Sequence, residues 1–532
     1  MKADEPVRRS GLRLVDAVLI ALGVAFGSIS LFYPFGRDQG LYYYVGREWA
    51  LHGAVPYRDV FDHKTPAIYI LHAGLVRLLG DGLWPIRVAE LAAIVAVGFL
   101  AARLARPSND ETPPGFRGLG VLIASVFYYG FFDFRETGEG EIWLALLGLA
   151  SVAAVRDVRR DSLAYPLAGA SAAAAILMKP SAIWFVFLAT GMLVMRARAG
   201  GLKAVVRALV LFGGGSVAVV APILAYFGAK HAFPAMHEIL VVANGYYVRH
   251  ESGVDSLGDI IFYHKWFFDW VQPFALWVVA GLLLVIVRAR RASDRATGAN
   301  LRLVLLLLFV SWAGVAMQLK FYLGHWGVMV PAATVATLSL FYILQRDGRG
   351  YWGRAVGTPA CAAIFLALFA ITPSRFVSYV KLAHSTADYA LGHIDWQTYG
   401  QNFVEHASGA RASDNIAVAE WIRDHTSPSD FIAVRGFQPQ IYAFAHRRYP
   451  GRFYWTSFMV SKSRAVKGPE WLAEDRRALA SNPPRIVVTI AGLNEGNTDC
   501  TDWWLPFGYT KRTTIGDFDV LERTPETATE QL

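Results

Sequence analysis

Long apolar runs separated by short polar loops dominate the chain from its N-terminus to about Arg375. One run is "VLFGGGSVAVVAPILAYFG" from Val210, and another is "LRLVLLLLFVSWAGVAM" from Leu301. Apolar runs of about 18 residues or more with few charges are typical of helices that cross a membrane. The pattern predicts eleven spans, at residues 15–34, 83–105, 118–133, 141–155, 163–178, 181–195, 206–228, 271–287, 302–318, 326–344 and 355–373.

The loops between the spans predict the orientation. Lys and Arg gather in alternate loops, at residues such as Arg9, Arg103, Arg156, Arg196, Arg288 and Arg346. Positively charged loops face the cytoplasm, so the N-terminus is expected inside and, with an odd number of spans, the C-terminus outside. The first apolar run is long and lacks a small-residue cleavage site, which favours a span over a cleaved signal peptide.

The pattern changes after Arg375, where helix-like and strand-like segments alternate. "DNIAVAEWIRDHT" predicts an amphipathic helix with Ser413 or Asp414 as its cap. Short runs rich in β-branched and aromatic residues predict strands at 431–435, 452–456, 485–490 and 517–523. The polar tail after Thr524 is predicted to be disordered.

The expected fold class is therefore mainly α, a polytopic transmembrane helix bundle with a C-terminal external α/β domain. The boundary is placed between residues 1–374 and residues 375–532. Composition agrees, because 54% of the residues are hydrophobic and only 17% are charged, against about a quarter charged in soluble proteins.

The net charge of +9 comes from the basic loops and indicates no nucleic-acid partner. Cys361 and Cys500 are the two cysteines and cannot form a disulfide framework. The sequence contains no CxxC, zinc-ligand spacing, P-loop or GxSxG motif.

The loop after the first span carries the candidate chemistry. It reads "GRDQGLYYYVGREWALHGAVPYRDVFDHKTPAIY" from Gly36. Residues 38–53 and 64–80 predict two helices along the membrane surface, because Tyr and Trp favour that interface. A carboxylate at the edge of the lipid can act as a base or hold a metal, and a Lys or His can hold a lipid phosphate. The loop offers Asp38, Asp59, Asp62, His63 and Lys64.

At these residues the chain resembles the first external loop of the GT-C glycosyltransferases, in the bacterial branch that includes aminoarabinose transferases of lipid A and protein O-mannosyltransferases. Three further segments resemble that branch in order: "RETGEGEIWLALLGLA" its acidic second loop, "ILMKPSAIWF" its Lys-Pro segment, and "QLKFYLGHWGVMVPAA" its Tyr-His-Pro segment. The stretch from Ala419 to Phe453 resembles its attached external domain. "DHKTP" replaces the "KPP" form common in relatives.

The resemblance implies transfer of a sugar from a polyprenyl-phosphate carrier on the external side of the membrane, with inversion at the anomeric carbon. It implies that Asp38 is the general base, whereas an Asp at this place can also cap the following helix. It implies that Lys64 binds the donor phosphate, whereas a Lys at a helix end can also be a membrane anchor.

Eight further residues are candidates by matched position or by charge at the membrane edge, where anchoring is the alternative role. The candidates for donor phosphate binding are His63, Lys179, Lys320, His325 and Arg87. The candidates for orienting the acceptor or holding a metal are Glu141, Glu139 and Asp62. The resemblance implies no definite cofactor, and a divalent cation bound by the glutamates stays an alternative.

The predicted function is a glycosyltransferase of the cell (inner) membrane with its active site on the external side. Its partners would be a polyprenyl-phosphate sugar, the lipid bilayer and an envelope glycan, lipid or protein acceptor. A polysaccharide polymerase or ligase would use similar lipid carriers and stays an alternative. An envelope transporter is the second alternative. A transporter would call for inverted repeats and for charges near the middle of the membrane, and no clear repeat is seen in the sequence.

Overall fold

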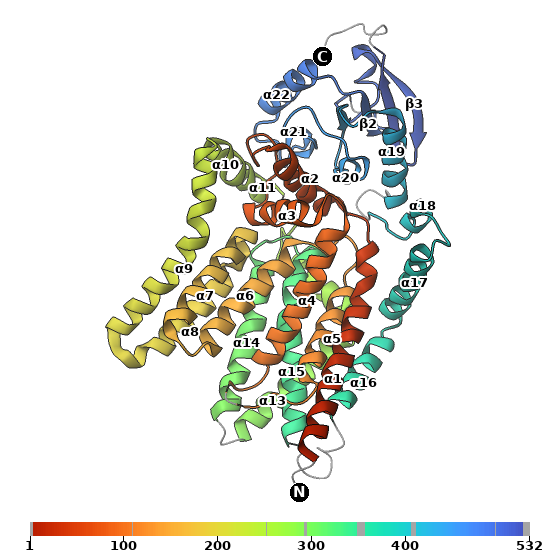
Figure 1. Ribbon diagram of the computed structural model, residues 1–532. Helices are drawn as coiled ribbons and strands as arrows, with labels where there is room; N and C mark the ends of the chain where they lie inside the picture. The colour runs from red at the N-terminus through yellow and green to blue at the C-terminus, as the bar shows by residue number, and fades with distance from the viewer. Residues whose placement is uncertain are drawn as a thin grey trace. The chain divides into compact units, whose positions relative to one another are not determined.

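The computed structural model describes residues 4–108, 110–251, 253–291, 295–347, 357–405, 411–494 and 496–524. Its fold is mainly helical, with one four-stranded sheet among these residues. The chain divides into two compact units (Figure 1). The first unit comprises Met1–Phe32, Arg87–Ile223 and Gly253–Ala383, and the second comprises Tyr33–Ile86, Leu224–Ser252 and His384–Leu532.

The first unit consists of helices, and each of the eleven predicted spans coincides with a helical segment. Its elements are α1 (Asp4–Gly27), η1 (Ser28–Phe32), α4 (Trp84–Leu104), α5 (Phe116–Tyr129), α6 (Gly140–Asp157), α7 (Asp161–Met178), η2 (Pro180–Ala182), α8 (Ile183–Ala197), η3 (Arg198–Gly200), α9 (Gly201–Ala229), α12 (Leu257–Trp270), α13 (Phe274–Arg291), α14 (Arg295–Ala316), η5 (Leu323–Val328), α15 (Met329–Asp347), α16 (Thr358–Ala370) and α17 (Pro373–Ala390). In Figure 1 several of them run alongside one another, and α5 packs against both α1 and α15.

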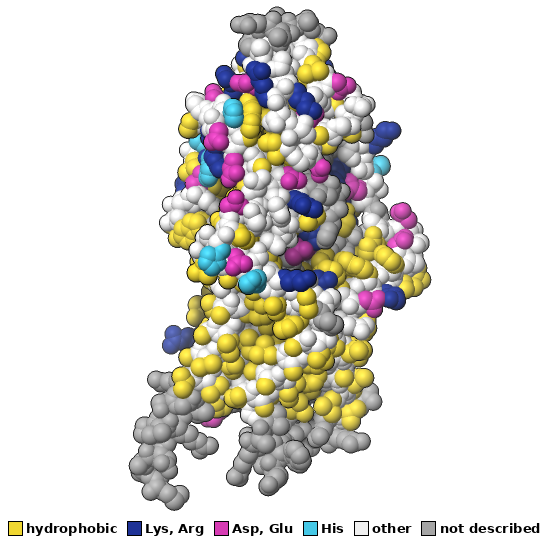
Figure 2. Space-filling model, turned by 90° about the vertical axis from the view of Figure 1, so that its right-hand side faces the viewer, with side chains coloured by type: hydrophobic (Ala, Val, Ile, Leu, Met, Phe, Trp, Pro, Cys, Tyr) yellow, Lys and Arg dark blue, Asp and Glu magenta, His cyan; other side chains and the backbone are white. Residues whose placement is uncertain are grey.

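Six helical stretches in the described residues are long and apolar enough to cross a membrane, and up to eight if each of two bent helix pairs is one span. One of the six, Pro180–Ala229, is 50 residues long and contains two of the predicted spans. On the face shown in Figure 2, hydrophobic side chains gather over the helices, as a lipid-exposed surface requires. The count of eleven and the sidedness stay predictions.

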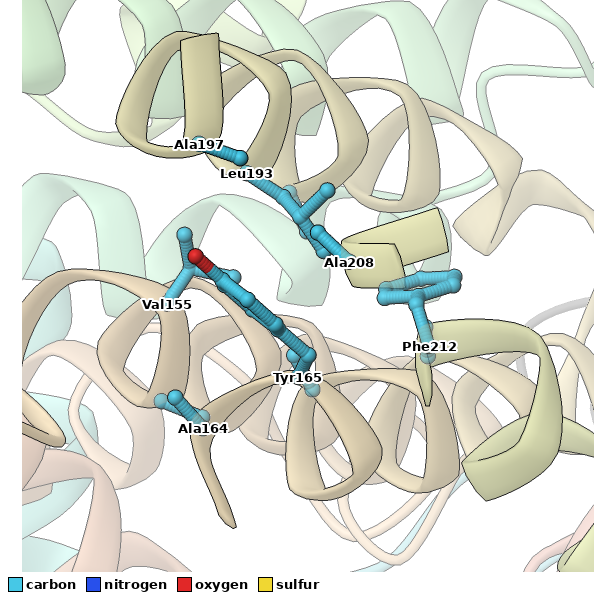
Figure 3. Close-up of a cluster of buried hydrophobic side chains, with 11 residues drawn as sticks. Val155, Ala164, Tyr165, Leu193, Ala197, Ala208 and Phe212 are labelled. Carbon is cyan, nitrogen blue, oxygen red and sulfur yellow. The ribbon is translucent and has the colours of Figure 1, made fainter. Parts of the chain in front are cut away.

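Helices α6 to α9 pack around a cluster of apolar side chains. Tyr165 of α7 lies between Val155 of α6 and Leu193 of α8, and Phe212 of α9 closes the cluster (Figure 3). Most of the other members are alanines, which let the helix backbones approach closely. In lipid, where apolar surface is already solvated, such close packing is the main attraction between helices.

Glycines allow the closest of these approaches. A Cβ on Gly169 of α7 would overlap the carbonyl oxygen of Phe212 on α9. The hydroxyl of Ser216 also donates a hydrogen bond of 3.0 Å to the Gly169 carbonyl. Small residues with an interhelical hydrogen bond are the usual means of joining membrane helices, so α7 and α9 approach closely at Gly169.

The second unit combines short helices with the sheet. Its elements are α2 (Arg37–His52), α3 (Pro66–Leu79), α10 (Phe233–His237), the π-helix η4 (Glu238–Ala243), α11 (Asn244–His250), α18 (Trp396–Gly400), α19 (Ala412–His425), β1 (Ile432–Val434), α20 (Gln440–Ala445), α21 (Ser457–Val460), α22 (Gly468–Ser481), β2 (Ile486–Ile490), η6 (Leu505–Phe507), β3 (Tyr509–Ile515) and β4 (Phe518–Arg523). The strand order is β1-β2-β4-β3, with β1 parallel to β2 and the other pairs antiparallel. The first predicted external loop thus belongs to the same compact unit as the C-terminal sheet.

Several local predictions for this unit are confirmed. The helices predicted at 38–53 and 64–80 are confirmed as α2 and α3, while their place at the membrane surface stays a prediction. Pro66 begins α3 at its first turn, where a missing N–H has no cost. Strands β1, β2 and β4 match three of the four predicted strands.

Other local predictions are wrong. Helix α19 begins at Ala412 with Arg411 before it, so Ser413 and Asp414 lie inside the first turn and neither is the cap. Residues 452–456 form no strand, because their aromatic side chains pack against the first loop, as in the contact of Phe453 with Phe61 at 5.3 Å between ring centroids. Strand β3 was not predicted. The tail after Thr524 lies outside the described residues.

The predicted sidedness can be tested by fusions after Thr524. Because the basic loops are expected in the cytoplasm, we expect alkaline phosphatase fused there to be active and a fluorescent protein that folds only in the cytoplasm to be dark. Fusions in the loop near Arg198 should give the opposite pattern. A fluorescent C-terminal fusion without phosphatase activity would contradict the predicted topology.

Candidate active site

Asp38 lies in the first turn of α2, immediately after the end of the first span. The helix starts after Gly36, whose backbone N–H donates to the side-chain oxygen of Gln39 at 2.5 Å. A carboxylate in the first turn is stabilised by the helix dipole. The side chain of Asp38 is 36% exposed, so the carboxylate is fixed by its helix and still accessible.

Lys64 lies beside this carboxylate. Its ammonium nitrogen is 3.8 Å from Oδ2 of Asp38, and the Lys64 side chain is 27% exposed. Its backbone is held by two buried tyrosines: the Tyr57 hydroxyl donates to the Lys64 carbonyl at 2.9 Å, and the Lys64 N–H donates to the Tyr69 hydroxyl at 3.1 Å. A candidate base and a candidate phosphate ligand are thereby held next to each other.

The next two candidates in this loop are Asp62, which is buried, and His63, whose side chain is 12% exposed. Oδ1 of Asp62 accepts a hydrogen bond of 2.7 Å from the His63 backbone N–H, while Oδ2 has no hydrogen-bond partner in the described part of the chain. Burial, reinforced by the charge of Lys64, lowers the pKa of the His63 imidazole. A neutral, mostly buried imidazole is a weaker phosphate ligand than the ammonium of Lys64.

A second group of candidates lies in the first unit. Glu141 is buried in the first turn of α6 and forms an ion pair with Lys179, the residue that follows α7. Glu139, half-buried, precedes α6 by one residue. A buried ion pair costs much to break when one partner is removed, so Glu141 and Lys179 position each other.

Lys320 and His325 come from the segment before α15 and lie in the same unit. Lys320 is only 6% exposed, and His325 lies in η5 with its ring 5.3 Å from that of Tyr322. The residues on both sides of Lys320, Leu319 and Phe321, have positive φ angles of 52° and 47°. Such strained backbone is retained where the surrounding structure imposes it, often at functional sites.

Arg87 is fully buried near the start of α4. Its guanidinium lies 3.4 Å from the carboxylate of Glu90 and donates to the Thr137 hydroxyl at 3.0 Å. The hydroxyl of Tyr128 also donates to Glu90, at 2.6 Å. Glu90 was not among the sequence candidates, although an acid inside a predicted span, three residues after an arginine, is itself a signal for a functional or paired group.

The candidates therefore fall into two sets. The second unit brings together Asp38, Asp62, His63 and Lys64. The first unit holds Arg87, Glu139, Glu141, Lys179, Lys320 and His325. Among the described residues, no group of three or more His, Cys, Asp or Glu side chains is arranged to hold a metal ion.

The C-terminal part of the second unit holds α2 in place. The Tyr44 hydroxyl accepts a hydrogen bond of 2.8 Å from the backbone N–H of Tyr449, and Glu48 pairs with Arg448 at 2.8 Å. A Cβ on Gly40 would lie 2.7 Å from the backbone nitrogen of Gln440. Because the helix carrying Asp38 touches this backbone directly, its position depends on the C-terminal segment.

We expect Gly40→Ala to destabilise the protein, because the added methyl group cannot fit against the Gln440 backbone. Overpacking of this kind costs about 1–3 kcal/mol. Gly74→Ala in α3 is the matched control, since a Cβ there meets nothing within 4 Å. Thermal unfolding of the purified variants would measure both, and equal stability of the two variants would contradict the close contact.

The chain is similar to known proteins in sequence and in fold. Residues 63–226 match the model of a family described as dolichyl-phosphate-mannose-protein mannosyltransferase. A comparison with curated protein sequences gave no match.

Solved structures extend the likeness over the whole chain. The crystal structure of ArnT from Cupriavidus metallidurans bound to undecaprenyl phosphate has a TM-score of 0.59 at 14% identity, covering 98% of this chain and 99% of that one. The apo structure of the same protein has a TM-score of 0.55 at 15% identity, covering 99% and 100%.

The helical fold, with its candidate membrane spans and small sheet, is shared with these solved structures. The chain thus has the fold of these two ArnT structures, and the match over residues 63–226 agrees with the resemblance to the GT-C glycosyltransferases seen in the sequence.

Proposed function

We propose that the protein is a membrane glycosyltransferase that transfers a sugar from a polyprenyl-phosphate donor to a cell-envelope acceptor. The observation that carries the proposal is the pairing of Asp38 with Lys64 at 3.8 Å in the loop that follows the first span. The family match supports a lipid-linked donor, and the undecaprenyl phosphate bound by ArnT is consistent with one.

The proposed step is a single inverting displacement. Asp38 accepts the proton of the acceptor hydroxyl as its oxygen attacks the anomeric carbon. The bond between that carbon and the phosphate oxygen breaks, and the lipid phosphate leaves with the electron pair. A base within hydrogen-bond reach and a fixed positive charge at the leaving oxygen are the two requirements of this step.

The two residues fit these requirements by position. Asp38 is partly exposed, so that an acceptor hydroxyl can reach its carboxylate, and the ammonium of Lys64 is close enough to bind the phosphate of the same donor. The Lys64 backbone is held by Tyr57 and Tyr69, which fixes the base of the side chain whose positive charge would stabilise the leaving phosphate.

The first-unit set would bind the donor and acceptor on the external side of the cell (inner) membrane. Lys179, Lys320 and His325 are proposed for the phosphate and its lipid. Glu141 and Glu139 are proposed to orient the acceptor. Arg87 is proposed in a supporting role, because Glu90 and Thr137 already engage its guanidinium.

The experiment is sugar transfer by membranes with and without this protein, from a panel of radiolabelled polyprenyl-phosphate sugars. We expect one donor to label an envelope glycan, lipid or protein only when the protein is present. Mass spectrometry of the purified protein should detect the same lipid-linked sugar. Movement of a free solute in reconstituted vesicles, without transfer from any donor, would favour the transporter instead.

A further inference from the structure

A cleft of about 340 Å³ lies in the first unit, between the C-terminal end of α4 and the start of α5. It is lined by Phe99, Leu100, Ala102, Arg103, Arg106, Thr112 and Arg117, and we refer to it as the arginine cleft. None of these lining residues, all of them described, carries a carboxylate. Three arginines therefore line one cavity, and none of the described residues in its wall is acidic.

Arg106 is the buried member of the three, with 6% exposure. One of its terminal nitrogens donates to the carbonyl oxygens of Pro107 and Asp110. Its Nε has no hydrogen-bond partner in the described part of the chain. Burial, together with the like charges of Arg103 and Arg156, lowers the pKa of Arg106. A buried cation with a spare donor and cationic neighbours would be stabilised by an anion.

The positive charges of the other two arginines are not fully offset by carboxylates of described residues. Arg103 is 49% exposed and lies 2.8 Å from Asp157, but Arg156 also binds that carboxylate, at 2.9 Å. Arg117 is exposed and forms no ion pair with a described residue. The side chain of Asp110 accepts from Tyr342 and does not line the cleft.

Apart from Thr112, the remaining wall is apolar. Phe99 is 40% exposed, and with Leu100 it lies about one turn before Arg103 on α4. Arg103 is sixteen residues from Arg87 on the same helix, about 24 Å along its axis. This is close to the ~30 Å thickness of the hydrocarbon layer, so the cleft lies at the end of α4 opposite the candidate donor-binding residue Arg87.

We propose that the arginine cleft binds the phosphate group of an anionic membrane lipid, with the acyl chain along Phe99 and Leu100. Guanidinium groups bind phosphate through paired N–H donors, and basic pockets between membrane helices are typical sites for lipid headgroups. Free phosphate offers the same charged group without the chain. The cleft is distinct from the proposed donor site, and the proposal does not depend on the transferase function.

The test is lipid binding by the delipidated full-length protein, measured by native mass spectrometry. The probes are dioleoyl phosphatidic acid and, as the zwitterionic control, dioleoyl phosphatidylcholine. We expect Arg103→Gln/Arg117→Gln to weaken phosphatidic acid binding at least about tenfold, since charge-assisted hydrogen bonds are lost. Arg198→Gln/Arg207→Gln is the matched control, because both arginines are exposed and lie outside the cleft.

The single variant Arg117→Gln, which breaks no ion pair with a described residue, guards against misfolding of the double variant and should also bind more weakly. Inorganic phosphate at millimolar concentration forms the second arm. Displacement of phosphatidic acid by phosphate would support the anion site and assign it to free phosphate, and failure to displace would support the lipid. Equal binding of the two lipids, or equal loss in the control variant, would overturn the proposal.

Discussion

Asp38→Asn is expected to reduce sugar transfer by about a hundredfold or more, the loss typical when a general base is removed. Asn has nearly the same size and can still sit in the first turn of a helix, so expression, membrane insertion and donor binding should change little. A structural role for Asp38 predicts near-normal transfer by the same variant. The measurement is single-turnover transfer from a bound lipid-phosphate sugar.

Asp59→Asn is the matched control for this change. Asp59 lies in the same loop, but its carboxylate binds Arg58 and the Val55 N–H instead of facing Lys64. We expect its variant to transfer sugar nearly as fast as the wild type. Near-normal turnover by the Asp38 variant would move the base elsewhere, with Asp62 or Glu141 as the next carboxylates to test.

Lys64→Ala is expected to weaken use of the donor more than tenfold. A charge-assisted hydrogen bond to the phosphate contributes about 1.5–3 kcal/mol, and this variant removes it while leaving the acceptor unaffected. The donor concentration dependence of transfer should therefore change far more than the acceptor dependence.

Lys462→Ala is the corresponding control, since Lys462 is exposed in the same unit and the substitution keeps the backbone carbonyl that accepts a hydrogen bond from Tyr246. Its donor kinetics should match the wild type. Unchanged donor kinetics in a well-folded Lys64 variant would exclude Lys64 from phosphate binding.

The elements with a strong periodic pattern could be predicted from the sequence. Helix α2 follows the spacing of Leu41, Val45 and Trp49, and β2 follows the run "RIVVTI". Strand β3 could not, because "YTKRTTI" is polar and pairs with β4 in a hairpin that turns at Gly516, where φ is +54°. Its strand structure comes from that pairing more than from its own hydrophobicity.

Contacts between segments that are far apart in the chain could not be predicted from the sequence either. The segment "RFYWT" has the composition of a strand but forms none. The ring centroids of its Trp455 and of Phe61 in the first loop are 6.0 Å apart. Tertiary packing of aromatic residues can override local strand preference. The association of the first loop with the C-terminal sheet in one unit follows from such contacts, which no local pattern reports.

The candidate site was predicted in part. The sequence singled out Asp38 and Lys64 separately, and the structure places them 3.8 Å apart. It did not indicate that His63 is mostly buried with a lowered pKa, or that Arg87 is already engaged by Glu90. Burial and pairing depend on the fold around a residue, whereas charge and position in a loop can be seen in the sequence.

The central claim is tested most directly by a stoichiometric single turnover with the purified protein. Protein loaded with a polyprenyl-phosphate sugar is mixed with its acceptor, and both products are followed by mass spectrometry, with the anomeric configuration read by nuclear magnetic resonance. We expect one polyprenyl phosphate to be released for each sugar transferred, and the anomeric configuration of the transferred sugar to be inverted. Release of lipid phosphate without a glycosylated acceptor, or a product of retained configuration, would contradict it.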